Sequence, residues 1–229
     1  MDKNKFLKYC LDNLDFDQPD QFEEYLSCVP LCAINSIYSI NTKYEAVLNV
    51  MNRCGIYFNI PAYHTPKGKI PDKKNQKTVS EIYDILKDLN PKILANDIFQ
   101  NRQLTSTKNG ILKADASLKF IRILKDFGIE TYQDINKLNC NETFEECIKR
   151  IPGQKSGISL KYFFMLTGTK DQIKPDRMVI GFIKDATGLT VSHNDALVLI
   201  RWTVEELIKN GYKKLSPRHL DNLIWNYQR

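Results

Sequence analysis

The segment Ile151-Pro-Gly-Gln-Lys-Ser-Gly-Ile-Ser159 joins two stretches with helical periodicity, Glu142–Arg150 and Leu160–Leu166. Its proline and two glycines predict a tight turn between two helices. The second helix begins with small residues, so its first backbone N–H groups lie open at the positive end of the helix dipole, and Lys155 adds a charge nearby. Such a turn suits a phosphate oxygen, although a plain helical corner has the same pattern.

Downstream of this turn, the sequence Lys174-Pro-Asp-Arg-Met-Val179 opens another amphipathic helix. Asp176 therefore lies at or beside a helix N-terminus, where the ionised form of a carboxylate is stabilised. Two interpretations follow from this position. Asp176 is either a carboxylate placed for catalysis or an N-cap of the kind that every helical protein has.

Helical periodicity extends over the rest of the chain, where apolar residues recur at spacings of three and four. The clearest predicted helices are Lys43–Cys54 before Gly55, Lys113–Phe127 before Gly128, Asn194–Asn210 after Ser192, and Pro217–Tyr227 after Ser216. Glycine stops and serine caps of this kind are typical of helix ends. No alternating β pattern persists and no internal repeat is evident. The sequence therefore predicts an all-α chain.

The composition is that of a globular protein: 42% of the 229 residues are hydrophobic and 26% are charged. This length is enough to bury a good core. No apolar run reaches the length of a membrane span, and the N-terminal segment has no signal-peptide core. We therefore expect a cytoplasmic protein with no membrane partner.

Positive charge is concentrated in one part of the chain. The formal net charge is +6, and the stretch from Tyr63 to Thr78 holds several lysines against a single acid, Asp72. These lysines are Lys67, Lys69, Lys73, Lys74 and Lys77. The cluster can meet phosphates through a salt-sensitive attraction, and it is equally expected of a solvated loop.

The six cysteines and three histidines have none of the spacings of a zinc site. No two cysteines form a CxxC pair, and the histidines lie far apart. In a cytosolic chain the cysteines are expected to be reduced, small core residues and not a disulfide framework. We therefore expect neither a metal nor a cofactor.

Hairpin, helix and aspartate together resemble the helix-hairpin-helix DNA glycosylase superfamily, the endonuclease III-like group. That family's motif runs hydrophobic-Pro-Gly, short turn, helix, loop, Asp, helix, and Ile151, Pro152, Gly153 and Asp176 occupy the matching places. The resemblance implies two helical lobes with a cleft between them. Residues 1–20 and 189–229 would form one lobe. Residues 21–188 would form a helical barrel that carries the hairpin motif (about 142–166) and Asp176.

The resemblance also implies roles for individual residues. The hairpin would bind the DNA backbone beside the lesion through Pro152, Gly153, Gln154, Lys155, Ser156 and Gly157. Asp176 would be the catalytic carboxylate that faces the flipped-out nucleotide. We expect Lys174 and Arg177, which flank Asp176, to contact DNA as well.

Two further loops are candidates for DNA contact. The resemblance places Asn41, in the loop Ser39–Thr42, where family members carry an intercalating amide; a helix cap ahead of Lys43–Cys54 is the alternative. Arg102, in the polar segment Asn101–Gln103, is a candidate for contact with a phosphate or the orphan base, or it lies in an ordinary surface turn.

Three departures from the family pattern shape the expected reaction. Lys155 stands where the family usually has a second hairpin glycine, and Gly157 stands where bifunctional members have their Schiff-base lysine. No cysteine follows Cys147, so the iron–sulfur cluster of many members is absent. An amine relocated to Lys155, Lys161 or Lys174 is the one route left to lyase activity.

The sequence thus favours a monomeric, monofunctional DNA glycosylase that acts on double-stranded DNA and is associated with the nucleoid. A carboxylate below the sugar lowers the barrier to glycosidic cleavage, because positive charge develops on that ring. Two alternatives stay open. One is a non-catalytic helix-hairpin-helix DNA-binding protein that keeps Asp176 only as a cap, and the other is an unrelated helical interaction protein.

Overall fold

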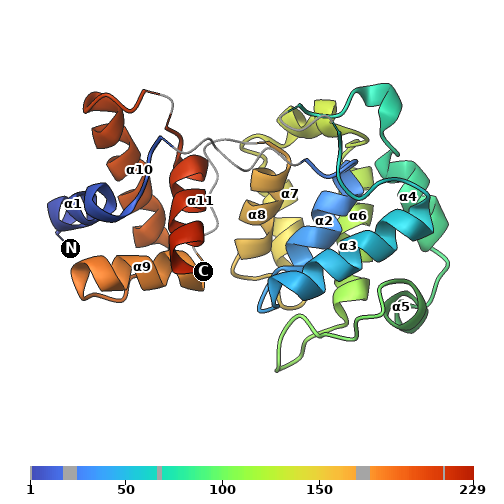
Figure 1. The fold of residues 1–229 in the computed structure, drawn as a ribbon. Helices are drawn as coiled ribbons and strands as arrows, with labels where there is room; N and C mark the ends of the chain where they lie inside the picture. The colour runs from blue at the N-terminus through green and yellow to red at the C-terminus, as the bar shows by residue number, and fades with distance from the viewer. Residues whose placement is uncertain (1, 18–24, 66–68, 169–175, 214) are drawn as a thin grey trace. The chain divides into compact units, whose positions relative to one another are not determined.

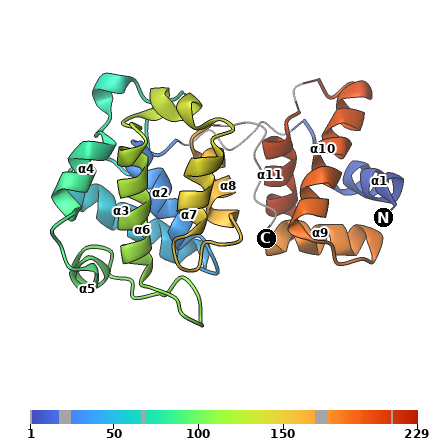
Figure 2. The ribbon, with the colours of Figure 1, turned by 180° about the vertical axis from the view of Figure 1, so that it is seen from behind.

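The chain is helical in all of its described parts. The computed structural model describes residues 2–17, 25–65, 69–168, 176–213 and 215–229 (Figures 1 and 2). Within these ranges no strand forms, and two isolated antiparallel bridges pair Leu26 with Tyr63 and Leu104 with Leu112. The prediction of an all-α fold is therefore confirmed. None of the helices in these ranges is both long enough and apolar enough to cross a membrane.

Two compact units make up the chain. Glu24–Gly168 forms one, which we call the central unit, whereas Met1–Glu23 and Thr169–Arg229 together form the terminal unit. The central unit contains α2 (Val29–Tyr38), α3 (Tyr44–Phe58), η1 (Lys73–Asn75), α4 (Val79–Leu86), α5 (Pro91–Ile93), η2 (Leu94–Ile98), α6 (Lys113–Asp126), η3 (Tyr132–Leu138), α7 (Glu142–Lys149) and α8 (Ile158–Leu166). The terminal unit contains α1 (Lys3–Asn13), α9 (Arg177–Thr187), α10 (His193–Lys209) and α11 (Pro217–Gln228).

Helix α2 is the core of the central unit. Its sequence, VPLCAINSIY, is largely apolar on every side, and all of its residues are buried, as expected of a helix surrounded by others. Helices α3, α4, α6 and α8 pack against it. Phe120 of α6 and Phe163 of α8 join this core, with ring centroids 4.9 Å apart. The packing fixes both ends of α2, and with them the segments that lead into and out of this helix.

The terminal unit closes around a second apolar core. Phe6 of α1 lies edge-to-face against Phe182 of α9, with ring centroids 5.9 Å apart, and apolar residues of α10 and α11 complete the cluster. Helix α9 thus belongs to this unit, whereas the expected boundary placed residues 169–188 in the barrel. The physical reason is the apolar stripe of α9, which includes Val179 and Ile183 and is buried with α1, α10 and α11.

Candidate nucleic-acid interface

The turn between α7 and α8 is a tight hairpin held by backbone hydrogen bonds. Gln154 N donates to Ile151 O and Gly157 N donates to Gln154 O, both at 2.9 Å. Gly153 and Gly157 have positive φ angles of 84° and 69°, which glycine adopts without the steric cost of a Cβ. The structure therefore has the turn that the proline and the two glycines predict.

Only part of the expected DNA-binding set lies on the surface of this hairpin. The exposed members are Pro152, Gly153, Lys155 and Ser156, while Gly157 is buried. Gln154 is 3% exposed, and its Oε1 accepts a hydrogen bond from Ser159 Oγ at 2.5 Å. The side chain of Gln154 therefore braces the turn from inside and does not reach a phosphate, which corrects the expectation for this residue.

The first turn of α8 has the character of an anion site. Its N-cap is Gly157, which has no side chain to accept the first N–H groups of the helix. Ser156 Oγ lies 3.5 Å from Ile158 N, a long hydrogen bond. The positive end of this helix is therefore poorly capped, and the exposed Lys155 adds a charge beside it. A phosphate oxygen would find both partners here.

Asn41 lies exposed in the turn that connects α2 to α3, with a φ of 51°. The N-cap of α3 is Lys43, so the alternative reading of Asn41 as the cap of that helix is wrong. The side chain of Asn41 makes no hydrogen bond to the other described residues. Its amide is therefore available to a ligand.

A second turn, which follows η2, is joined to the turn that holds Asn41. Thr42 Oγ1 donates a hydrogen bond to Gln103 Oε1 at 2.7 Å. The neighbouring Arg102 is exposed, and its Nε donates to Asn96 Oδ1 at 2.6 Å. The structure thus brings the two loop candidates, Asn41 and Arg102, to neighbouring turns.

Leu104 is a residue of this second turn that sequence reasoning missed. It is 52% exposed, although the residues around it, from Asn101 to Gly110, are mostly polar. A single apolar residue within a polar run is the sequence signal that could have identified Leu104. Exposed apolar side chains on a DNA-facing loop are the type that wedge between base pairs.

Lys113, at the start of α6, holds the two turns together from beneath. Lys113 is 2% exposed. Its Nζ donates to Thr42 Oγ1 at 2.6 Å and to Gln103 Oε1 at 3.1 Å, and also to the carbonyl oxygens of Tyr38 and Ile40. These carbonyls lie at the C-terminal end of α2, where the helix dipole favours a cation. The ammonium group therefore fixes the positions of both turns.

Sequence reasoning missed Lys113 as well, although the sequence carries a signal for it. The residue is in register with Ser117, Phe120 and Leu124, all of which lie on the buried face of α6. A lysine in this register is fully buried only where its ammonium group finds partners. The periodicity that predicts α6 therefore also singles out its first residue.

Replacement of Lys113 by methionine should destabilise the protein by about 2–4 kcal/mol, because it leaves buried carbonyl and hydroxyl oxygens without a donor. Urea unfolding followed by far-UV circular dichroism measures the loss. The matched control is Lys119→Met on the same helix, where the ammonium group is half-exposed and pairs with Asp115. That change should cost no more than about 0.5 kcal/mol. Equal stability of the two variants would show that the Lys113 ammonium does not hold the turns.

The hairpin meets the second turn at Gly153. A Cβ at Gly153 would lie 2.5 Å from both Cβ and Oγ1 of Thr105. Thr105 is buried and held by Ile111, which accepts from Thr105 N at 2.9 Å and donates to Thr105 Oγ1 at 3.2 Å. The hairpin and the two turns therefore form one continuous surface, which we call the loop face. It lies along the lower edge of the central unit in both ribbon views (Figures 1 and 2).

Asp176 belongs to the terminal unit, where it is the N-cap of α9. Its Oδ1 accepts hydrogen bonds from Met178 N at 2.8 Å and from Val179 N at 3.4 Å. Within the described ranges Oδ2 makes no hydrogen bond, and the residue is only partly buried. Arg177, beside it, is exposed. Lys174 lies outside the described residues.

Metal-binding clusters are absent from the described part of the chain, since no three His, Cys, Asp or Glu side chains there could hold an ion together. All six cysteines are free thiols, and Cys10, Cys28, Cys32 and Cys54 are buried. Burial raises the pKa of the Cys28 thiol to about 12. The four buried thiols are therefore protonated core residues and not nucleophiles.

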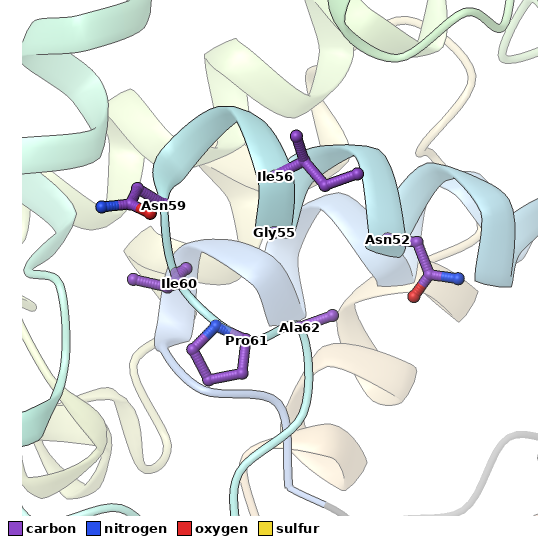
Figure 3. A pocket seen from close by; sticks show the side chains of 7 residues that line it. All are labelled: Asn52, Gly55, Ile56, Asn59, Ile60, Pro61 and Ala62. Carbon is purple, nitrogen blue, oxygen red and sulfur yellow. The ribbon is translucent and has the colours of Figure 1, made fainter.

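A surface hollow of about 550 Å³ lies where α3 ends, and Figure 3 shows the residues that line it. They are Asn52, Gly55, Ile56, Asn59, Ile60, Pro61 and Ala62. None of these has a titratable side chain, and Ile56 is 82% exposed. In Figure 3 the side chains of Ile56 and Asn59 point away from each other. The hollow therefore offers no group for acid–base chemistry.

Comparisons with known proteins give one match. A family model described as a domain of unknown function (DUF8548) matches residues 4–229. The comparisons with curated proteins and with solved structures found no match.

Proposed function

We propose that this chain, which belongs to the DUF8548 family, is a monofunctional DNA glycosylase that releases a damaged, mismatched or modified base. The observation that carries the proposal is the loop face. Three segments that the sequence singled out separately, the turn with Asn41, the turn with Arg102 and the hairpin, meet on one side of the central unit. A chance set of surface turns has no reason to converge in this way.

The loop face has the groups that a DNA duplex requires. Lys155 and the poorly capped start of α8 offer partners to a backbone phosphate. Asn41 and Leu104 are exposed beside Arg102, where an amide and an apolar wedge would replace a base that has left the stack. Phosphate contact and base displacement would thus occur on one surface.

Asp176 is the proposed catalytic carboxylate. The C1′–N bond breaks with its electron pair going to the base, and positive charge develops on the sugar. The negative carboxylate stabilises that charge, water adds its hydroxyl to C1′, and the base takes up the proton. Gly157 offers no amine for a Schiff base, which supports a hydrolytic reaction without strand cleavage.

The alternative is a DNA-binding protein without catalysis, and one observation favours it. Asp176 Oδ1 is already occupied by two backbone N–H groups of α9, which is all that an N-cap requires. The loop face would then bind DNA in the same way, and Asp176 would serve only the stability of α9. Both functions place a monomer on nucleoid DNA.

A panel of damaged, mismatched and modified duplexes tests the proposal. Incubation with the protein, followed by heat or alkali, should break the strand at an abasic site in at least one duplex. Salt-dependent duplex binding without base release would favour the alternative, and the absence of binding to every duplex would contradict both. Borohydride treatment with an abasic duplex should trap no covalent adduct; an adduct would point to Lys155, Lys161 or Lys174 and overturn the monofunctional assignment.

Replacement of Lys155 by glutamine should weaken binding to all duplexes alike. The loss of one phosphate contact should lower the slope of log affinity against log salt by about 0.9, and affinity in 0.1 M salt should fall about eightfold. Fluorescence anisotropy at several salt concentrations measures both quantities. Lys137→Gln is the control, because Lys137 is an exposed residue of η3, a segment that does not contribute to the loop face. An unchanged slope for Lys155→Gln would remove the hairpin from the phosphate contact.

A further inference from the structure

The segment from Lys69 to Lys77, which we call the lysine segment, has no part in the loop face. Its four lysines are at least partly exposed: Lys69, Lys73, Lys74 and Lys77. Lys67, which belongs to the same cluster in the sequence, lies outside the described residues. The lysine segment contains one acid, Asp72. A group of like charges this dense repels itself unless a partner of opposite charge offsets it.

No ion pair neutralises these lysines. None of the four pairs with another residue in the described ranges. Three lysines elsewhere in the chain, by contrast, lie with Nζ within 3.0 Å of a carboxylate oxygen three or four positions away: Lys87 beside Asp84, Lys119 beside Asp115 and Lys209 beside Glu206. The positive charge of the lysine segment is therefore open to a ligand.

Two acids on the elements beside the lysine segment have other partners. Glu81, in the first turn of α4, accepts a hydrogen bond from Thr78 N at 2.6 Å. Glu130, just before η3, accepts one from Ser80 N at 2.9 Å and another from the Ser80 hydroxyl group. Both carboxylates thus stabilise the start of α4, and neither forms an ion pair with the lysine segment.

The lysine segment is clamped to η3 by two glutamine side chains. Gln76 is 8% exposed, and its Nε2 donates to Pro71 O at 2.7 Å and to Gln133 Oε1 at 3.0 Å. Gln133 Nε2 also donates to Pro71 O, at 3.0 Å, and Gln76 Oε1 accepts from Tyr132 N at 3.1 Å. A solvated loop would let its like charges separate, whereas this clamp holds them together. The clamp therefore favours contact with phosphates over the alternative of a solvated loop.

Polar side chains continue the surface beside the last lysine. His64, Thr65 and Asn75 line a hollow of about 230 Å³ together with Lys77, and their side chains make no hydrogen bond to the other described residues. Hydroxyl and amide groups of this kind contact the phosphates and sugars of nucleic acids. Binding to an anionic membrane requires apolar side chains that insert, and Ile70 is the one exposed large hydrophobic residue of the lysine segment. The surroundings thus favour a nucleic acid.

The lysine segment and the loop face lie at opposite ends of α6. Lys113, which holds the loop face, is the first residue of this helix. The lysine segment adjoins the residues that follow α6, where Val79 N donates to Glu130 O at 3.0 Å. The helix has 14 residues and is therefore about 20 Å long; Figure 2 shows it running between the lower and upper edges of the central unit. The two surfaces are therefore distinct.

We propose that the lysine segment binds the phosphodiester backbone of a nucleic acid, as a second contact surface separate from the loop face. A duplex carries about one negative charge per 1.7 Å of its axis, a density that matches lysines held close together. The polar residues around the hollow add hydrogen bonds to the same backbone. The contact is independent of base sequence and does not rest on glycosylase activity.

Titration of the ¹⁵N-labelled full chain with an unmodified duplex of about 12 base pairs, in 0.1 M salt, tests the proposal. The amide signals of Lys73, Lys74 and Lys77 should shift and saturate, with a Kd of about 1–100 µM. The triple variant Lys69→Gln/Lys73→Gln/Lys74→Gln removes three phosphate contacts. The Kd that the signals of the lysine segment report should therefore rise at least about fiftyfold. These signals separate the segment from any binding at the loop face.

A second triple variant, Lys87→Gln/Lys119→Gln/Lys209→Gln, is the matched control. It loses the same three charges, but from lysines that are paired with acids. Its Kd should stay within about threefold of wild type, since salt screens exposed charges outside the contact. The first variant relieves repulsion between like charges, so its Tm should equal or exceed that of wild type. If it fails to fold, Lys74→Gln alone, with an expected rise in Kd of about eightfold, decides the outcome.

Three results would overturn the proposal. One is a duplex titration that leaves the signals of the lysine segment unshifted. Another is an equal Kd for the two triple variants, because the protein would then respond only to net charge. The third is binding of polyglutamate, or of vesicles of phosphatidylserine and phosphatidylcholine, at least as tight as that of the duplex at equal charge concentration. Failure of base release in the damaged-duplex panel would leave this titration unaffected, so the two proposals fail separately.

Discussion

Asp176→Asn is expected to reduce base release by about 10³-fold while duplex affinity stays within about twofold of wild type. The amide has nearly the shape of the carboxylate but no negative charge, so it cannot stabilise the positive charge that develops on the sugar. Asparagine is as good an N-cap as aspartate. The hydrogen bonds to Met178 N and Val179 N can therefore persist, and α9 should stay folded.

Single-turnover base release on the best duplex of the panel measures this effect, and anisotropy measures the affinity. Asp2→Asn provides the control, because Asp2 is also an N-cap aspartate of the terminal unit, with Oδ1 3.1 Å from Lys5 N. Its base release should equal that of wild type. Unchanged turnover in Asp176→Asn would remove Asp176 from the mechanism and leave the non-catalytic alternative in its place.

Gly153→Ala is expected to destabilise the protein by about 2–5 kcal/mol. The φ of 84° costs an alanine about 1–2 kcal/mol. The new Cβ would also overlap Thr105, at 2.5 Å from two of its atoms, and overpacking of this kind adds about 1–3 kcal/mol. Relief of the overlap must push the hairpin away from the turn that follows η2.

Gly128→Ala separates these two causes. Gly128 has a φ of 69°, and no atom lies within 4 Å of the position of its Cβ. It should therefore lose only the conformational part, about 1–2 kcal/mol. At a temperature where both variants are folded, Gly153→Ala should bind duplex about tenfold more weakly, since the hairpin phosphate contact is displaced, while Gly128→Ala binds normally. Equal losses of stability would show that hairpin and turn are not in contact.

Local patterns in the sequence were enough to predict the elements that carry the candidate site. The apolar spacing from Lys113 to Phe127 predicts α6, which ends at Asp126. The Pro-Gly turn predicts the hairpin, and the position of Asp176 predicts an N-cap, which the structure has. These features depend on residues a few positions apart, so the sequence alone predicts them.

The helix end predicted at Gly55 is wrong. The glycine predicts the end of the helix that begins near Lys43, yet α3 continues to Phe58. A Cβ at Gly55 would lie 2.9 Å from the carbonyl oxygen of Ile60. The residue is glycine because the chain folds back closely against the helix. A position requires glycine either because its backbone adopts a positive φ or because another segment approaches it closely, and the sequence does not distinguish these two reasons.

Hydrogen bonds between side chains and partners far apart in the sequence were not predicted either. Gln154 has the polarity of a surface residue, but its amide is used by Ser159 inside the turn. Lys113 contacts oxygen atoms more than 70 positions away, at Tyr38 and Ile40. Hydrogen bonds of this kind leave no periodic pattern, because they depend on the tertiary packing of α2 against α6. The convergence of the loop face therefore emerged only from the fold.

The connectivity of the terminal unit determines which of the two units can fold first during synthesis. Its first helix, α1, precedes the whole central unit, and its other helices follow it. During synthesis the central unit, which is continuous in sequence, can fold before Phe182 has been made and can pack against Phe6. Tyr227, near the last residue of α11, donates a hydrogen bond to Asn13 at 3.0 Å. The first and last helices therefore belong to one unit and are joined directly, so we expect the two ends of the chain to unfold together.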